Sequence, residues 1–212
     1  MTDTIKTCLV LAPHPDDGEF GCGASIKKLV DNGIKVWYAA LSPCTISVPK
    51  EFEKDILYKE LKNATKILGI NSDNIITFDF NVREFPKYRQ DILEELIQLK
   101  KAIQPDLVLL PNSDDVHQDH RTIYEEGKRA FKHSRILGYE LPWNSTKFIS
   151  NFHIKVSKNH LEAKYQALQE YKSQKFRTYH SKDFIQGLAR VRGVQTNSEY
   201  AEAFELVRWH LD

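Results

Sequence analysis

Short apolar runs alternate with segments of helical period in this 212-residue chain, and this alternation restricts the fold more than any other feature. Four runs predict strands that are buried on both faces. They are "TCLVL" from residue 7, "VWYAAL" from residue 36, "NIITF" from residue 74 and "DLVLL" from residue 106.

The segments between these runs carry apolar residues at helical spacing. In the first segment the apolar residues are four, three and four positions apart, and a glycine follows them (Leu57, Leu61, Ala64 and Leu68). The second segment has the same spacing and ends before Pro105 (Ile92, Leu96, Leu99 and Ile103). Strands that alternate with helices at this interval need crossover connections, which are right-handed. The pattern therefore predicts an α/β protein, a Rossmann-like three-layer α/β/α sandwich with a mainly parallel central sheet.

The second half of the chain continues less regularly. A helix is expected after "HQDH" at 117 and up to about Phe131, followed by the strands "RILGYE" and "FHIKVS". Another helix starts near Asn159, and the tail predicts a helix over about 182–192 and an extended segment over 203–208. No repeat or linker divides the chain, so we expect one domain over 1–212, with a C-terminal extension of about 179–212 packing near the site.

Composition excludes several classes of protein. With 30 basic and 29 acidic residues the net charge is +1, which argues against nucleic-acid binding and against an anionic membrane surface. The chain shows no long apolar span, and its polar start "MTDTIKT" does not resemble a signal peptide. Its three scattered cysteines are typical of reduced thiols. These features predict a cytoplasmic protein and leave homo-oligomer formation open.

Two polar clusters follow the first and fourth predicted strands. The first strand ends in the sequence His14, Pro15, Asp16, Asp17, and "HQDH" at residues 117–120 follows the fourth. Ligands of open α/β sheets bind beyond the carboxyl ends of the strands, and in the usual order the first and fourth strands are neighbours. We therefore expect the two clusters to meet.

A divalent cation would explain why adjacent carboxylates sit at the end of a buried strand, where they repel each other. Imidazole and carboxylate donors together favour zinc or another late first-row metal. His14 and Asp17 are placed to face one ion, and a histidine of the second cluster would complete three ligands with an open position for water.

Each cluster also has other interpretations. The glycines of "GEFGCGAS" lack dinucleotide-binding spacing, and Asp16 and Asp17 would repel a pyrophosphate. A lone aspartate pair often caps a helix, and two histidines at this spacing often only line a helix face. The predicted convergence of both clusters favours the metal site.

The sequence resembles the LmbE-like, or PIG-L, family of zinc-dependent N-deacetylases. The resemblance rests on "PHPDDGEFGCG" and "HQDHR", with "ARVRGVQTNSEYAEAF" as a weaker match in the tail. It implies a hydrolase that uses one Zn²⁺ to remove the acetyl group of an N-acetylglucosamine-like amino sugar, free or in a glycoconjugate or nucleotide-sugar precursor.

The resemblance also implies roles for individual residues. The metal ligands would be three residues, namely His14, Asp17 and His120. Asp16 would be the general base, acting on metal-activated water, and a protonated His117 would stabilise the oxyanion, oriented by Asp119.

Substrate contacts are expected elsewhere in the chain. Arg190 and Arg192 in the tail are candidates for binding an acidic substrate group. Leu57 stands where several sugar-specific family members carry an arginine, so the sugar contacts of this chain differ from theirs.

The sequence leaves two competing hypotheses about function open. One keeps the metal and changes the bond, to an N-formyl group or a phosphoester. The other is a non-catalytic sugar-binding module of the same fold, against which the presence of Asp16 argues, because the metal does not need it as a ligand.

Overall fold

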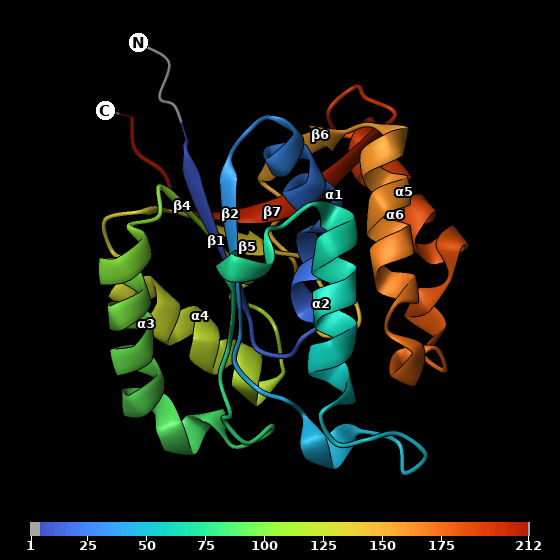
Figure 1. The fold of residues 1–212 in the computed structure, drawn as a ribbon. Coiled ribbons are helices and arrows are strands. Elements are labelled where there is room, and N and C mark those ends of the chain that lie inside the picture. Colours follow the sequence, from blue (N-terminus) through green and yellow to red (C-terminus); the bar gives the residue numbers. More distant parts are fainter. Residues whose placement is uncertain (1–4, 212) are drawn as a thin grey trace.

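The computed structural model describes residues 5–211, which form three layers around a seven-stranded sheet (Figure 1). Residues 1–4 and 212, which the predicted domain includes, lie outside the described part. The strands are β1 (Thr7–Ala12), β2 (Lys35–Ala40), β3 (Ile75–Thr77), β4 (Leu107–Pro111), β5 (Arg135–Tyr139), β6 (Phe152–Val156) and β7 (Tyr200–Arg208).

The strand order across the sheet is β3-β2-β1-β4-β5-β7-β6. Neighbours from β3 to β5 pair in parallel, whereas β7 runs antiparallel to both β5 and β6. The predicted mainly parallel sheet is confirmed, and so is the predicted contact between the first and fourth strands, because β1 lies between β2 and β4.

Helices cover both faces of the sheet (Figure 1). On one side lie α1 (Asp17–Asp31), α2 (Ile56–Leu68), α5 (Lys158–Gln169) and α6 (Lys182–Val194), and on the other α3 (Arg89–Ile103) and α4 (Gln118–Ala130). Side chains alternate along each strand, so Val10 of β1 packs in the first core and Leu9 in the second. Two apolar cores therefore hold the central strands.

Two segments differ from the sequence-based expectation. β3 is a short edge strand whose Ile75 and Ile76 are only partly buried, not a strand buried on both faces, because it has a strand neighbour on one side only. The tail is not simply an extension, since β7 begins at Tyr200 and lies inside the sheet between β5 and β6.

A buried ion pair supports α1, which is interrupted by non-helical backbone angles at Cys22. Lys164 Nζ donates to the carbonyl of Phe20 at 2.6 Å and to Glu202 Oε1 at 2.6 Å. Glu202 in turn accepts from the backbone N–H groups of Ala24 and Ser25. The backbone groups that the kink would leave unpaired are thus satisfied from α5 and β7.

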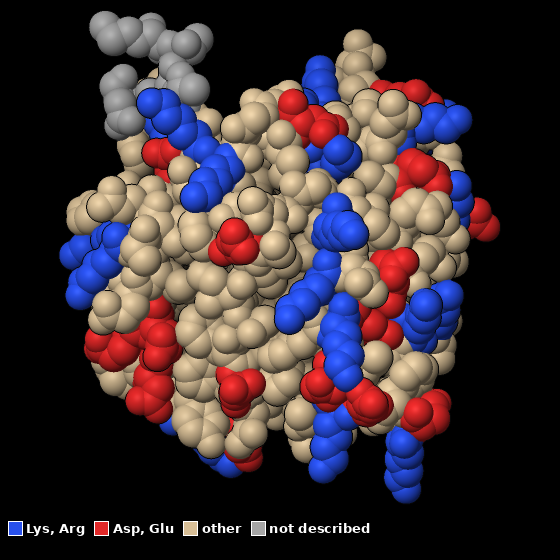
Figure 2. Space-filling model, viewed as in Figure 1, with Lys and Arg blue, Asp and Glu red and all other residues tan. Residues whose placement is uncertain are grey.

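The molecular surface carries mixed charges. Lys and Arg intermingle with Asp and Glu on the face that Figure 2 shows.

Among residues 5–211, every helix is too short or too polar to cross a bilayer.

Candidate metal centre

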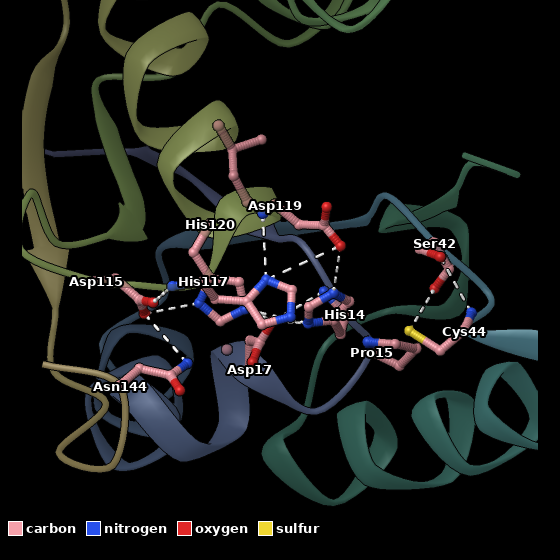
Figure 3. Close-up of polar contacts among 12 residues, drawn as sticks. His14, Pro15, Asp17, Ser42, Cys44, Asp115, His117, Asp119, His120 and Asn144 are labelled. Atoms are coloured by element: carbon pink, nitrogen blue, oxygen red, sulfur yellow. Dashed lines mark hydrogen bonds and ion pairs between the residues drawn. The ribbon is translucent and has the colours of Figure 1, made fainter. Parts of the chain in front are cut away.

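The two polar clusters meet where β1 and β4 end (Figure 3). After β1 a four-residue turn leads into α1, which begins at Asp17, and after β4 a loop leads into α4, which begins at Gln118. Because β1 and β4 are adjacent and parallel, both loops leave the same edge of the sheet. Three histidines, His14, His117 and His120, and the carboxylate of Asp17 come together there, as the sequence predicts.

Three donor atoms form a small triangle in this cluster. His14 Nδ1 lies 3.1 Å from Asp17 Oδ2 and 3.1 Å from His120 Nε2, and His120 Nε2 lies 3.2 Å from Asp17 Oδ2. Ligand atoms of a tetrahedral zinc site with bonds of about 2.0–2.1 Å are about 3.3 Å apart. The triangle has the size of one face of such a site, so these residues fit a zinc ion.

Carboxylates behind the two histidines set the direction of their lone pairs. His120 Nδ1 is 2.7 Å from Asp115 Oδ2, and His14 Nε2 is 3.1 Å from Asp119 Oδ2. In the neutral rings the proton therefore lies toward the carboxylate, and the other nitrogen presents its lone pair to the triangle. Lone pairs that converge with a carboxylate oxygen repel each other unless a cation lies between them.

Without a metal, protons take the place of this cation. Burial lowers the pKa of His120, but the charges of Asp17 and Asp115 outweigh burial and raise the pKa to about 10. Burial raises the pKa of Asp17, but His120 and His14 outweigh burial and hold this pKa well below its usual range. Binding of a metal at these donors would therefore release protons.

His117 has a different environment from the other two histidines. It is the N-cap of α4, and its Nδ1 accepts the backbone N–H of Asp119 at 3.2 Å. The Nε2 atom therefore carries the ring proton. Burial and the charges of His120 and His14 lower the pKa of His117 to about 4. A pKa of about 4 favours a neutral ring near neutral pH, whereas the family resemblance implies a protonated one; the ring lines the cleft.

Asp119 contacts a different histidine from the one that sequence suggested. Its Oδ2 lies 3.1 Å from His14 Nε2 but 4.0 Å from His117 Nδ1. The backbone N–H groups of Arg83 and Phe85 also donate to this carboxylate, at 2.6 and 3.2 Å. Asp119 therefore orients His14 and anchors the loop before α3, and its hydrogen bond with His117 is made by its backbone N–H.

An open cleft of about 400 Å³ lies over the triangle. The partly buried Asp16 lines it beside His14, Asp17, His117 and His120. Burial, and secondarily the neighbouring charge of Asp17, raises the pKa of Asp16 to about 6. A carboxylate with this pKa can accept a proton near neutral pH and release it again.

The arginines expected to bind substrate lie outside this cleft. Arg190 is exposed and pairs with Glu199 at 3.4 Å, and Arg192 pairs with Glu140 at 2.5 Å. Neither of them is among the lining residues, whereas Arg177 is. Its segment, between two short 3₁₀ turns, has no periodic pattern that would have singled it out in the sequence. Leu57 is buried and lines the cleft.

A buried network below the first cluster holds the His-Pro-Asp-Asp turn. The hydroxyls of Tyr38 and Tyr171 each lie 2.8 Å from the carbonyl of Pro15, and both contact the carboxyl of Glu19. Gly18 must be glycine here, because a Cβ would lie 2.5 Å from the Tyr38 hydroxyl oxygen. Gly18, and likewise Gly21 beside Tyr139, therefore allow close packing against tyrosine.

Asp115 is a functional candidate that the sequence did not single out, although it lies two residues before His117. We expect Asp115→Asn to weaken zinc binding by about 10–100-fold, because the amide removes the charged partner of His120. Competition with a chromogenic chelator measures this affinity. The neighbouring Asp114→Asn is the matched control, since its carboxylate contacts no histidine in the described part of the chain. Equal zinc affinity in both variants would contradict the role of Asp115.

Comparisons with known proteins agree with this fold. One relative is the uncharacterized deacetylase YaiS of Escherichia coli K12, which is 27% identical over 174 residues (79% of this chain, 91% of that protein). Another is the diacetylchitobiose deacetylase of Thermococcus kodakarensis, which is 33% identical over 125 residues (55% of this chain, 46% of that protein). The matched part thus spans about half the length of the second relative. The solved N,N′-diacetylchitobiose deacetylase of Pyrococcus horikoshii superposes with a TM-score of 0.76 at 23% identity, over 95% of this chain and 83% of that one.

A comparison with protein families matches residues 9–131 to the family described as PIG-L, GlcNAc-PI de-N-acetylase. The matched region runs from β1 to the end of α4 and contains both polar clusters. Because this match covers more than half of the 212 residues, the chain belongs to the PIG-L family.

Proposed function

We propose that this protein is a zinc-dependent hydrolase that removes the N-acetyl group from an amino sugar, acting as a single cytoplasmic domain on a small-molecule or glycoconjugate substrate. The observation that carries the proposal is the triangle of His14, Asp17 and His120 at the floor of an open cleft, with Asp16 beside it. The relatives named above are deacetylases, which supports the choice of an amide bond.

The donor set favours one Zn²⁺ held by His14, Asp17 and His120. His117 also belongs to the histidine cluster, whose ligand atoms lie within 4.8 Å of one another. The Nδ1 atom of His117 accepts a hydrogen bond from the Asp119 backbone, and His117 is not part of the smaller triangle. We therefore assign His117 the role of contacting the substrate and not the metal. When bound, zinc supplies a Lewis acid that polarises an acyl oxygen and lowers the pKa of water toward about 7.

The residues of the chain divide the remaining work. Asp16 is a carboxylate above its pKa of about 6, so it accepts a proton from the attacking water. The same carboxyl then donates this proton to the amine nitrogen as the C–N bond breaks. His117 donates its Nε2 proton as a hydrogen bond to the acyl oxygen, on which negative charge develops. Acetate and a free amino sugar leave the cleft.

A combined metal and product measurement tests this function. The purified protein should contain about one zinc ion per chain by mass spectrometry of metals. It should release acetate and a free amine from at least one of a set of N-acetylated monosaccharides, oligosaccharides and nucleotide sugars. Parallel assays for formate and phosphate test the other bonds. Release of formate or phosphate without acetate would replace this proposal by a different hydrolase.

A further inference from the structure

Two arginines from separate loops line the cleft beside the metal centre. Arg83 lies in the loop between β3 and α3, and Arg177 lies between the 3₁₀ turns Lys172–Gln174 and Thr178–His180. Within residues 5–211 neither guanidinium pairs with a carboxylate. Arg192, by contrast, is paired with Glu140. Two cations that face a substrate cleft without a carboxylate at ion-pair distance can bind an anionic group of the substrate.

Arg177 is held in place by a chain of buried polar groups. Its Nε donates to Gln174 Oε1 at 2.9 Å, and Gln174 Nε2 lies 3.2 Å from Ser173 Oγ. Ser173 is bound through both its N–H and its hydroxyl to Glu60 of α2, at 2.9 and 2.6 Å. Glu60, Ser173 and Gln174 are all at least 96% buried. This support uses the Nε edge of the guanidinium and leaves the two terminal nitrogens free of carboxylate partners.

The position of Arg83 is likewise fixed by its backbone. Its N–H donates to Asp119 Oδ2 at 2.6 Å, its carbonyl accepts from Gln118 Nε2 at 3.0 Å, and its φ is 67°, in the left-handed region. An arginine in this conformation is uncommon, and such conformations cluster at functional sites. The side chain is exposed and has no polar contact in the described structure. Its backbone is therefore tied to the metal centre while its charge remains available at the cleft.

The charge of the cleft defines the class of ligand. Asp17 is balanced by the histidines and by the metal of the proposed function. The charge of Arg177 acts on Asp16 and lowers its pKa, but no ion pair joins the two side chains, so both guanidinium groups keep terminal N–H donors for an anion. Arginine binds phosphate and carboxylate groups through paired N–H donors and remains charged at all relevant pH values. We infer that the substrate is an N-acetylated amino sugar that carries a phosphate or carboxylate group, bound by Arg177 and Arg83. This inference rests on the proposed function for the amino sugar and on the two arginines for the anion.

Binding of the amino-sugar products tests the inference without turnover. The probes are glucosamine 1-phosphate, glucosamine 6-phosphate and muramic acid, with neutral methyl glucosaminide as reference, titrated calorimetrically into the zinc-loaded protein. At least one anionic probe should bind ten or more times tighter than the neutral one at low ionic strength. Arg177→Gln and Arg83→Gln should each reduce this ratio by at least threefold. Phosphate probes and the carboxylate probe identify which anion is preferred.

A matched variant controls for the loss of charge. Lys175→Gln removes a cation from the same segment, but Lys175 does not line the cleft, so the ratio should stay as in the wild type. Equal affinity for neutral and anionic probes in the wild type would overturn the inference, as would an equal loss in the Lys175 variant. Failure to release acetate from any acetylated probe would instead count against the proposed function, while the binding ratio still decides the role of the arginines.

Discussion

Asp16→Asn should lower kcat by about 10³-fold and leave the zinc content unchanged. The amide is nearly the same size as the carboxyl group, but it cannot accept the proton of the attacking water. Asp16 lines the cleft and is not part of the donor triangle, so the metal loses no ligand. A loss of this size corresponds to about 4 kcal/mol in the activation free energy. Acetate release and metal analysis on the same preparation measure both quantities.

The adjacent Asp17→Asn gives a matched comparison, because the same chemical change falls one residue later in the chain. Asp17 contributes Oδ2 to the triangle, so this variant should lose zinc as well as activity. Retention of activity in Asp16→Asn would remove Asp16 from the mechanism. Identical zinc contents in the two aspartate variants would contradict the division of roles between them.

The pH profile of the wild type provides a further readout of Asp16. A general base acts in its deprotonated form, so kcat/KM should rise with pH through the pKa of Asp16. Burial and Asp17 place this pKa at about 6, and a bound cation would lower it. The acidic limb should therefore lie at or below about pH 6, and it should be absent from the residual activity of Asp16→Asn.

His120→Ala should reduce zinc affinity by more than about 100-fold, beyond the effect of removing a residue that only orients a ligand. The side chain is buried, and its Nε2 lies 3.1 Å from His14 Nδ1 and 3.2 Å from Asp17 Oδ2. Its loss leaves two donors at the triangle and abolishes the three-ligand site. Equilibrium dialysis against buffered zinc measures the affinity, and circular dichroism confirms that the variant is folded.

His117→Ala distinguishes the two histidines of the "HQDH" motif. We expect this variant to keep its zinc and to lose about 10²–10³-fold in kcat, because it removes a hydrogen-bond donor to the acyl oxygen. If His117→Ala lost zinc while Asp17→Asn kept it, the ligands would be the three histidines. That result would reassign the site without changing its location.

Much of the fold follows from local patterns in the sequence. Burial of an element depends on the spacing of its own apolar residues, so the stripes that begin at Leu57 and Ile92 predict α2 and α3 directly. The parallel order near β1 and β4 follows from the short crossovers between strands and helices. The positions of β7 and β3 in the sheet do not follow from such patterns. A strand's position at an edge or between two neighbours depends on what packs beside it, and this information is absent from its own residues.

The sequence by itself determined which groups the candidate metal centre contains: a histidine and two aspartates after one strand, and two histidines after its neighbour in the sheet. The tertiary structure decided how these groups are used. Asp119 contacts His14, Asp115 contacts His120, and burial lowers the pKa of His117 to about 4. Likewise, only the folded chain places Arg177 in the cleft and Arg192 against Glu140. Local sequence patterns show which side chains each loop carries, whereas hydrogen bonds between distant segments depend on how those segments pack.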